Sequence, residues 1–194
     1  MEHIAKLAGL ESLSLRYTDI TDKGMPNLTD LEKLKRLDLK GVDLTDHGLE
    51  NLAALSQLET LDLSYGRFSA AGIKSLTGLQ QLKSLWLDQT RVNDSTMESV
   101  AQFPRLESLS LEYTSISDAG LGKLAGLNSL AELRLDRTNI TDASVKMLTG
   151  LHKLRYVDLY HTLVSEPGFE SMKKALPACR INWSQDAARR ERRS

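Results

Sequence analysis

The chain is poor in the residues that form cross-links, kinks and aromatic cores. Its 194 residues include one cysteine, four prolines and only 5% aromatic side chains. The single cysteine, Cys179, excludes a disulfide within the chain, which is typical of a reducing compartment or a bacterial protein. No apolar run approaches the roughly 18 residues of a membrane-spanning helix. Residues 1–15 also lack the basic start and long apolar stretch of a signal peptide.

The net charge and the absence of catalytic motifs argue against several classes of function. The net charge is −1, so no strong overall field favours nucleic acid or an anionic membrane. We find no metal-ligand spacing of Cys and His, no phosphate-binding glycine loop and no nucleophile motif. Asp38 and Asp62 resemble paired acids, but an open sheet would not raise their pKa values as catalysis requires. The sequence therefore predicts no catalytic residue, no cofactor and no metal.

What the chain has in abundance is leucine at a fixed period of 24 residues. We call Leu10 repeat position 1. Leucine or another apolar residue then recurs at positions 1, 4 and 6 without a slip in register. Position 1 holds Leu10, Leu34, Leu58, Leu82, Leu106, Leu130, Leu154 and Ala178. Such self-similarity indicates a stack of repeats that share one continuous core.

The spacing within one unit predicts its secondary structure. Positions 4 and 6 alternate with polar residues, which places them on one face of a strand. Apolar positions 16, 19 and 22 are spaced for one face of a short helix, as in Met25, Leu28 and Leu31. Each unit is thus strand, turn and helix, and the crossover through a helix makes neighbouring strands parallel.

Two polar columns have structural interpretations. Position 9 is threonine in five of the seven units, with Val42 and Gly66 as the exceptions, and a buried hydroxyl there can bond a backbone group. Position 12 carries Thr, Ser or Asn, which are good helix N-caps. An acid usually follows at position 13, where it favours the positive end of a helix. We therefore interpret these Thr-Asp pairs as caps rather than as sites.

With these repeats, the chain resembles a leucine-rich-repeat protein from Met1 to about Trp183. Residues 106–127 (LESLSLEYTSISDAGLGKLAGL) and 130–151 (LAELRLDRTNITDASVKMLTGL) resemble the 24-residue bacterial form, which is related to the ribonuclease-inhibitor-like type. The resemblance implies an α/β leucine-rich-repeat solenoid, a curved right-handed β-α superhelix. Its parallel sheet would form the concave face and its helices the convex face. It also implies a partner on the concave face, without naming one.

The two ends are expected to differ from the interior. We predict a leucine-rich-repeat domain over residues 1–183, with about seven repeats, a partial N-terminal helix and a final strand capped by Trp183. Met1, Ile4 and Leu7 match helix positions, which leaves an apolar end face open to self-association. Residues 184–194 form a basic C-terminal tail, whose four arginines we interpret as a solvated segment.

The candidate binding face is defined by strand positions 3, 5 and 7, with position 8 at its rim. Six of the seven Tyr and Trp residues fall at these positions, whereas all three Phe fall at core positions. Tyr, Trp and Arg are enriched at binding hot spots. The candidates for partner binding are Arg16, Tyr17, Arg36, Lys40, Tyr65, Trp86, Asp88, Glu112, Tyr113, Arg134, Asp136, Tyr156, Asp158 and Tyr160.

Three of these candidates form an acidic row. Asp88, Glu112 and Asp136 share position 7 on consecutive strands, and carboxylates on neighbouring strands repel each other unless water, Arg134 or a partner relieves them. One interpretation is that the row meets basic groups of a partner; the other is that it keeps an open face solvated.

The sequence therefore predicts a non-catalytic scaffold that binds an unidentified protein or peptide, without membrane insertion. Three alternatives stay open: a glycan-binding surface, a structural spacer that assembles through its N-terminal end, and nucleic-acid binding by the tail alone. The sequence assigns neither the compartment nor the partner.

Overall fold

A computed structural model describes residues 3–186 and contains one parallel sheet of eight strands in sequence order. The strands are β1 (Ser12–Ser14), β2 (Arg36–Asp38), β3 (Thr60–Asp62), β4 (Ser84–Trp86), β5 (Ser108–Ser110), β6 (Glu132–Arg134), β7 (Tyr156–Asp158) and β8 (Arg180–Asn182). Each residue pairs with the residue 24 further along, so that Leu37 lies between Leu13 and Leu61. The constant register turns every repeat position into a straight row across the sheet, as the 24-residue period predicts.

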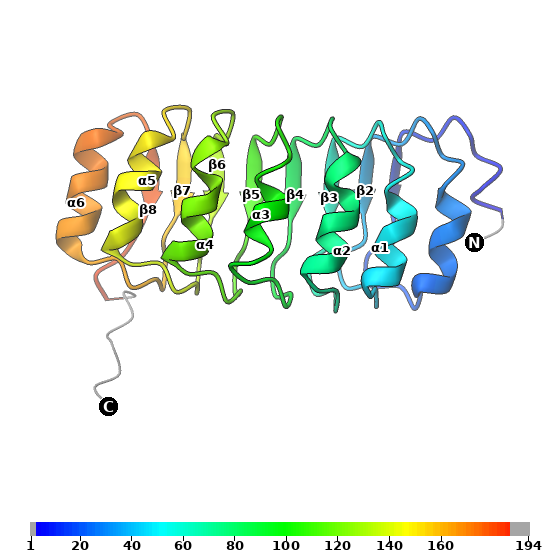
Figure 1. Ribbon diagram of the computed structural model, residues 1–194, viewed down its shortest axis with the longest axis horizontal. Helices are drawn as coiled ribbons and strands as arrows, with labels where there is room; N and C mark the ends of the chain where they lie inside the picture. Colours follow the sequence, from blue (N-terminus) through cyan, green and yellow to red (C-terminus); the bar gives the residue numbers. More distant parts are fainter. Residues whose placement is uncertain (1–2, 187–194) are drawn as a thin grey trace.

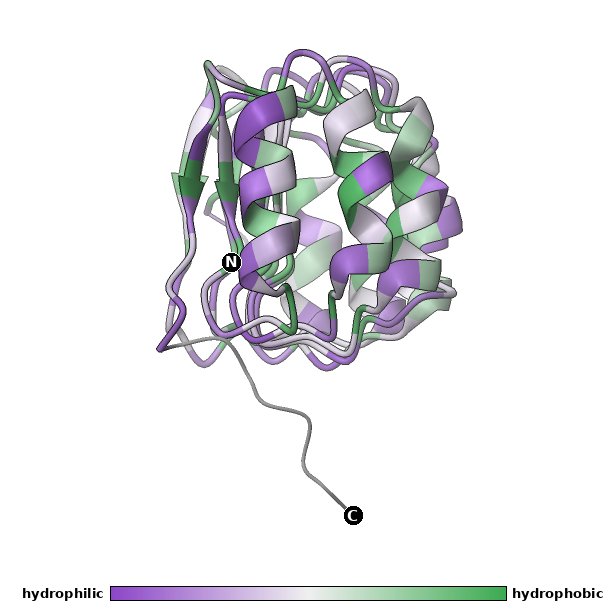
Figure 2. Cartoon of the chain, turned by 90° about the vertical axis from the view of Figure 1, so that its left-hand side faces the viewer, coloured by the Kyte–Doolittle hydropathy of each residue, from purple (hydrophilic) through white to green (hydrophobic). Residues whose placement is uncertain are grey.

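A layer of short helices covers one face of the sheet (Figure 1). The helices are η1 (Asp22–Leu28), α1 (Asp46–Leu52), α2 (Ala70–Ser75), η2 (Leu76–Gly78), α3 (Met97–Val100), α4 (Asp118–Gly122), η3 (Lys123–Gly126), η4 (Asp142–Ser144), α5 (Val145–Gly150) and α6 (Glu166–Ala175). The end view separates the strand layer from the helix layer (Figure 2). The helices leave the other face of the sheet open to solvent.

The core fills the space between the two layers. Met25, Leu28 and Leu31 are fully buried from the helix side, and Leu85 and Leu87 from the strand side. This confirms that each unit buries its apolar positions only against its neighbours. Of the three phenylalanines, Phe68 and Phe103 are buried as predicted, but Phe169 is half-buried at the C-terminal end.

The position-9 threonines close the turn that follows each strand. The hydroxyl of Thr114 donates to the backbone oxygen of Leu111 at 2.6 Å, and Thr18, Thr90 and Thr162 make the same bond three residues back. Each bond stays within one repeat, so the column is a series of local bonds rather than a ladder between repeats. Val42 interrupts it as predicted, because it has no hydroxyl.

We expect Thr114→Val to lower the free energy of unfolding by about 1 kcal/mol, because it removes one buried hydrogen bond and keeps the side-chain shape. Urea denaturation measures the change, and Val42→Thr, which extends the column, is the matched control with the opposite sign. Equal midpoints for Thr114→Val and the parent would contradict this role.

The position-13 acids bind the next repeat, which the sequence did not predict. Asp46 lies at the start of α1, but its carboxylate accepts hydrogen bonds from Ser69 N and Oγ at 2.6 and 2.7 Å and from Gly72 N at 3.1 Å. Burial acts to raise the pKa of Asp46, but these bonds outweigh it and hold the pKa below its usual value. The expectation that these acids serve their own helix was therefore incomplete, because the stacking brings the next N-cap within reach. Asp22, Asp94, Asp118 and Asp142 make equivalent bonds.

These acids crowd position 15, which holds glycine in five of the seven units. A Cβ on Gly72 would lie 2.6 Å from Asp46 Oδ1, which is closer than such atoms approach. Where the acid is replaced by Ala70, position 15 of the next unit holds Thr96 instead of glycine, and its Oγ1 accepts a hydrogen bond from Asn93 N at 3.3 Å. In this unit the threonine hydroxyl takes the place of the missing carboxylate. Ser144 departs from glycine in a different way, because Asp118 is kept and the serine hydroxyl donates to it.

The ends differ from each other. At the N-terminus, residues 3–6 form turns, with Leu7 N bonded to Ile4 O, where the repeat pattern predicted part of a helix. Met1 and most of the predicted basic tail lie outside the described residues. At the C-terminus, Trp183 stacks on Phe169 with ring centroids 4.7 Å apart, and its indole N–H donates to Val164 O at 2.9 Å. The predicted cap over the last layer is thus formed by two stacked rings.

Candidate functional site

The open face of the sheet collects the predicted binding residues because of the constant register. Row 5 runs Ser14, Asp38, Asp62, Trp86, Ser110, Arg134, Asp158 and Asn182 across the eight strands. Neighbouring members of a row are separated by one strand spacing, about 4.8 Å. A row is the set of residues at one repeat position on successive strands. We call the surface formed by rows 3, 5, 7 and 8 the sheet face. It extends across all eight strands.

Tyrosines line one edge of the sheet face. Apart from Leu7, the large hydrophobic residues that the structure shows as exposed are Tyr17, Tyr65, Tyr113 and Tyr160. Three of them have a cation over the ring: Arg16 lies 5.6 Å from the Tyr17 centroid, and Lys40 and Arg137 lie 5.4 and 5.1 Å from those of Tyr65 and Tyr113. The rings therefore present faces and hydroxyls to solvent on a charged border.

The backbone at position 8 fixes how these rings project. The position-8 residues that follow β1 to β7 all have positive φ: Tyr17, Gly41, Tyr65, Gln89, Tyr113, Arg137 and His161. This left-handed conformation costs a non-glycine residue about 1–2 kcal/mol. The repeat therefore turns sharply at the strand end. Sequence reasoning placed the tyrosines at the rim but did not predict this conformation, because tyrosine gives no signal for it.

Gly41 allows two of the tyrosines to meet. The rings of Tyr17 and Tyr65 lie 6.4 Å apart at an angle of 58°, although a whole repeat separates them. Gly41 stands between them in row 8, where a Cβ would collide with the Tyr17 ring. Gln89 Nε2 donates to the Tyr65 hydroxyl at 3.0 Å and extends the cluster toward the centre. The N-terminal half of the rim is thus a connected aromatic surface.

Two of the three carboxylates in the acidic row have close polar partners within the chain. Asp88 accepts hydrogen bonds from Ser110 Oγ at 2.5 Å and from Glu112 N at 2.9 Å, and Asp136 lies 3.0 Å from His161 Nδ1. Burial raises the pKa of Asp88 despite these bonds. Arg134, the source of relief within the chain that the sequence suggested, comes no closer than 3.9 Å to Glu112.

Glu112 is the member of the acidic row whose charge is least compensated within the chain. Arg134 is held at 2.7 Å by Glu132, on its own strand, so it only partly compensates Glu112. Burial, and then the charge of Asp88, raises the pKa of Glu112 to about 7. The side chain is only 26% exposed. A carboxyl that resists ionisation near neutral pH would gain from a cationic group placed over it.

We expect Glu112→Gln to stabilise the protein above pH 7. The native pKa of about 7 exceeds the ordinary 4.5, so the folded state binds the proton more tightly and loses stability as the pH rises from about 4.5 to about 7. Glutamine stays neutral, so the gain should reach about 1–2 kcal/mol at pH 8 after solvent screening and vanish at pH 4. Urea denaturation at both pH values measures it. A variant less stable than the parent at pH 8 would contradict this environment for Glu112.

The C-terminal strands hold a compact polar cluster. The Tyr156 hydroxyl donates to Asp158 at 3.1 Å, and Asp158 also accepts from Tyr160 N at 2.9 Å and Asn182 Nδ2 at 3.0 Å. Burial and the adjacent Asp158 raise the pKa of Tyr156. Arg180 and Arg134 lie 5.8 and 5.5 Å from the centroid of the Tyr156 ring. Sequence reasoning missed Arg180 and Asn182, although rows 3 and 5 extend to them.

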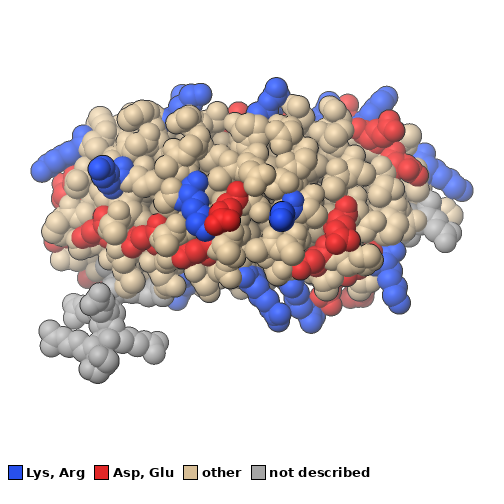
Figure 3. Space-filling view, in the orientation of Figure 1, with Lys and Arg blue, Asp and Glu red and all other residues tan. Residues whose placement is uncertain are grey.

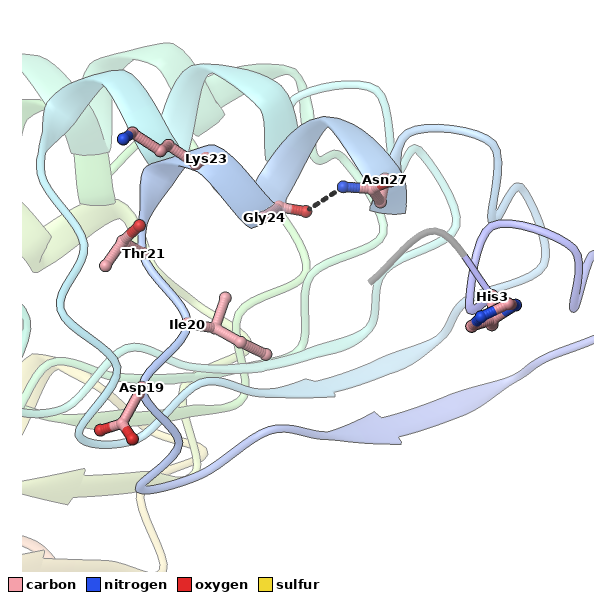
Figure 4. A pocket seen from close by; sticks show the side chains of 7 residues that line it. All are labelled: His3, Asp19, Ile20, Thr21, Lys23, Gly24 and Asn27. Atoms are coloured by element: carbon pink, nitrogen blue, oxygen red, sulfur yellow. Dashed lines mark hydrogen bonds between the residues drawn. The ribbon is translucent and has the colours of Figure 1, made fainter.

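Within residues 3–186, no three His, Cys, Asp or Glu side chains are placed to hold a metal ion. A hollow of about 440 Å³ at the N-terminal end includes His3, Asp19 and Lys23, but these side chains do not converge, and the hydrogen bond drawn there joins Asn27 to Gly24 O at 3.2 Å (Figure 4). Burial raises the pKa of the Cys179 thiol, which disfavours a nucleophilic role.

The helix face offers a contrast to the sheet face. Acidic and basic side chains are interspersed over it (Figure 3). Pairs such as Lys123–Glu98, 2.7 Å apart, link neighbouring repeats. None of the exposed tyrosines projects from a helix. Among the residues described, no helix is long and apolar enough to cross a membrane.

Comparison with known proteins agrees with this geometry. Models of leucine-rich repeats match residues 104–164 and residues 10–28. Among the solved structures that match, internalin C2 of Listeria monocytogenes superposes with a TM-score of 0.72 and 27% identity over 93% of this chain and 76% of that chain. No curated protein matches the chain. The repeat models, the eight-stranded parallel sheet and the internalin-like fold together identify the chain as a leucine-rich-repeat protein.

Proposed function

We propose that this chain is a non-catalytic binding module that holds a protein or peptide against its sheet face. The exposed tyrosines carry the proposal, because Tyr17, Tyr65, Tyr113 and Tyr160 all lie along one edge of that face. Tyrosine supplies a large contact area at a small cost in conformational entropy. Leucine-rich repeats generally mediate protein binding, which supports the same choice.

The shape of the sheet face favours a macromolecule over a small metabolite. A small ligand binds in a concave pocket that buries most of its surface. Here the predicted candidates are spread over seven of the eight strands, β1 to β7, and the turns that follow them. A protein surface or an extended peptide can contact the aromatic rim and the acidic row at the same time. Charges of both signs along the face would orient such a partner.

Affinity capture from a cell lysate tests the proposal. The bait is the parent chain, and the comparison is the variant Trp86→Ala, Tyr113→Ala, Tyr156→Ala with an unchanged circular dichroism spectrum. A protein that the parent captures and the variant loses supports binding on the sheet face. A protein that both capture equally places the contact on the helices or an end and contradicts the proposal.

Two other functions have a specific observation in their favour. Exposed aromatic rings on an open sheet also stack on sugars, so the exposed Tyr17 and Tyr65 rings favour glycan binding as the first alternative. At the same end of the chain, Leu7 is 52% exposed and β1 is the edge strand of the sheet, which favours assembly through the N-terminal end as the second alternative. A glycan array detects the first, and concentration-dependent sedimentation detects the second.

A further inference from the structure

A hollow of about 340 Å³ lies on the N-terminal half of the sheet face. Small side chains on β1 and β3, among them Ser12, Ser14 and Thr60, leave its floor low. Trp86 rises at one side of the hollow, and Asp38 and Asp62 also line it. The hollow is therefore large enough for one long side chain and has an aromatic wall beside two carboxylates.

The ring of Trp86 has no cation over it within the described chain, although other rings of the sheet face do. Tyr17, Tyr65, Tyr113 and Tyr156 each have an Arg or Lys within 6 Å of the ring centroid. Tryptophan binds a cation more strongly than tyrosine does. The ring with the greatest affinity for a cation is thus the one that lines an open hollow.

The carboxylate of Asp62 can accept further hydrogen bonds. It lies directly opposite Trp86 in the register of β3 and β4. Its carboxylate accepts one hydrogen bond within residues 3–186, from Ser64 N at 2.9 Å, and forms no ion pair there. Asp38 is better satisfied, because Ser14 Oγ and Lys40 N donate to it at 3.1 Å and Arg16 lies 3.7 Å away. A cation in the hollow would find its free acceptor on Asp62.

Arg36 limits what else the hollow can hold. Its side chain lines the hollow, is exposed and makes no ion pair within the described residues. It would repel a second positive charge and attract a carbonyl or carboxylate oxygen. One occupant fits both the Trp86–Asp62 side of the hollow and the Arg36 side. It is a cationic side chain attached to a peptide backbone, with a backbone carbonyl toward Arg36.

We propose that this hollow binds an arginine side chain presented by the protein partner, with its guanidinium against Trp86 and hydrogen-bonded to Asp62. A planar guanidinium can stack on an indole and keep its in-plane N–H groups free for a carboxylate. This assignment rests on the proposed function and specifies which chemical group of the partner enters the face. It adds a role for Asp62, which the sequence offered only as half of an apparent acid pair.

Nuclear magnetic resonance tests the assignment with defined peptides. The two tryptophans give two indole N–H signals, and Trp86→Phe identifies the signal of Trp86. The probe is acetyl-Gly-Arg-Gly-amide, and the control peptide replaces arginine by citrulline, which has nearly the same shape without the charge. We expect the arginine peptide to shift the Trp86 signal saturably, and citrulline to bind at least about 10-fold more weakly. The Trp183 signal should not move.

Two protein variants complete the experiment. Asp62→Asn can still accept the bond from Ser64 N, so it should fold while weakening the arginine peptide about 5- to 10-fold. Asp30→Asn makes the same change in net charge at an exposed acid outside the hollow and should bind as the parent does. Equal binding of both peptides, or no loss in Asp62→Asn, would overturn the assignment. In that case captured partners that depend on Trp86, Tyr113 and Tyr156 would still support the proposed function, so the two failures are distinguishable.

Discussion

Replacing Asp46 by alanine should lower the free energy of unfolding by about 3 kcal/mol, because the groups that it bonds on the next repeat lose a charged acceptor. Those groups are Ser69 N, Ser69 Oγ and Gly72 N. Gly72→Thr should cost about 2 kcal/mol, since its Cβ collides with the Asp46 carboxylate. Urea denaturation of both variants measures these losses.

The double variant Asp46→Ala, Gly72→Thr should be more stable than the sum of the single losses predicts. It recreates the pair Ala70 and Thr96, in which a threonine hydroxyl accepts the N–H of position 12. We expect a favourable coupling free energy of about 2–3 kcal/mol from the double-mutant cycle. Additive losses would show that the acid and the glycine act independently, contrary to the contact between repeats described above.

Trp183→Ala should cost about 3 kcal/mol and loosen the last repeat, because it removes a large ring from the end of the core. The same change leaves Phe169, on α6, without its stacking partner. Trp183→Phe keeps an aromatic ring against Phe169 but loses the hydrogen bond to Val164 O, so it should cost only about 1 kcal/mol.

Hydrogen exchange locates the effect of Trp183→Ala. Amides of α6 and β8 should exchange faster, while those of β3 and β4 keep the parent rates, since each repeat contacts mainly its neighbours. Uniformly faster exchange along the whole chain would contradict the view that Trp183 acts as a local cap.

The fold could be predicted from the sequence because the same pattern of apolar and polar positions recurs in every repeat. The leucine columns predicted the strands, their register and the buried positions, and position 3 to 8 geometry placed Trp86 and the tyrosines on one surface. The contacts between repeats were less predictable. Nothing in a Thr-Asp pair reveals that Asp46 bonds Ser69 rather than its own helix, since that choice depends on how neighbouring helices stack.

Local conformation and fine electrostatics were also beyond the sequence. The left-handed backbone of Tyr113 follows from the turn that closes each strand, and tyrosine has no preference that announces it. The acidic row was visible, but the bonds from Ser110 to Asp88 and from His161 to Asp136 depend on side-chain positions. The hollow beside Trp86 was missed because it is made by the small size of its neighbours on other strands.

The most direct test of the central claim is the affinity of a captured partner for three forms of the chain, measured by isothermal titration calorimetry. They are the parent, the sheet-face variant Trp86→Ala, Tyr113→Ala, Tyr156→Ala, and a helix-face variant Lys74→Ala, Lys146→Ala, Glu170→Ala, whose residues are exposed on the opposite side. We predict that the sheet-face variant binds at least about 100-fold more weakly, as loss of hot-spot aromatics does, and that the helix-face variant stays within about twofold of the parent. A partner whose affinity falls in the helix-face variant and stays the same in the sheet-face variant would contradict the account.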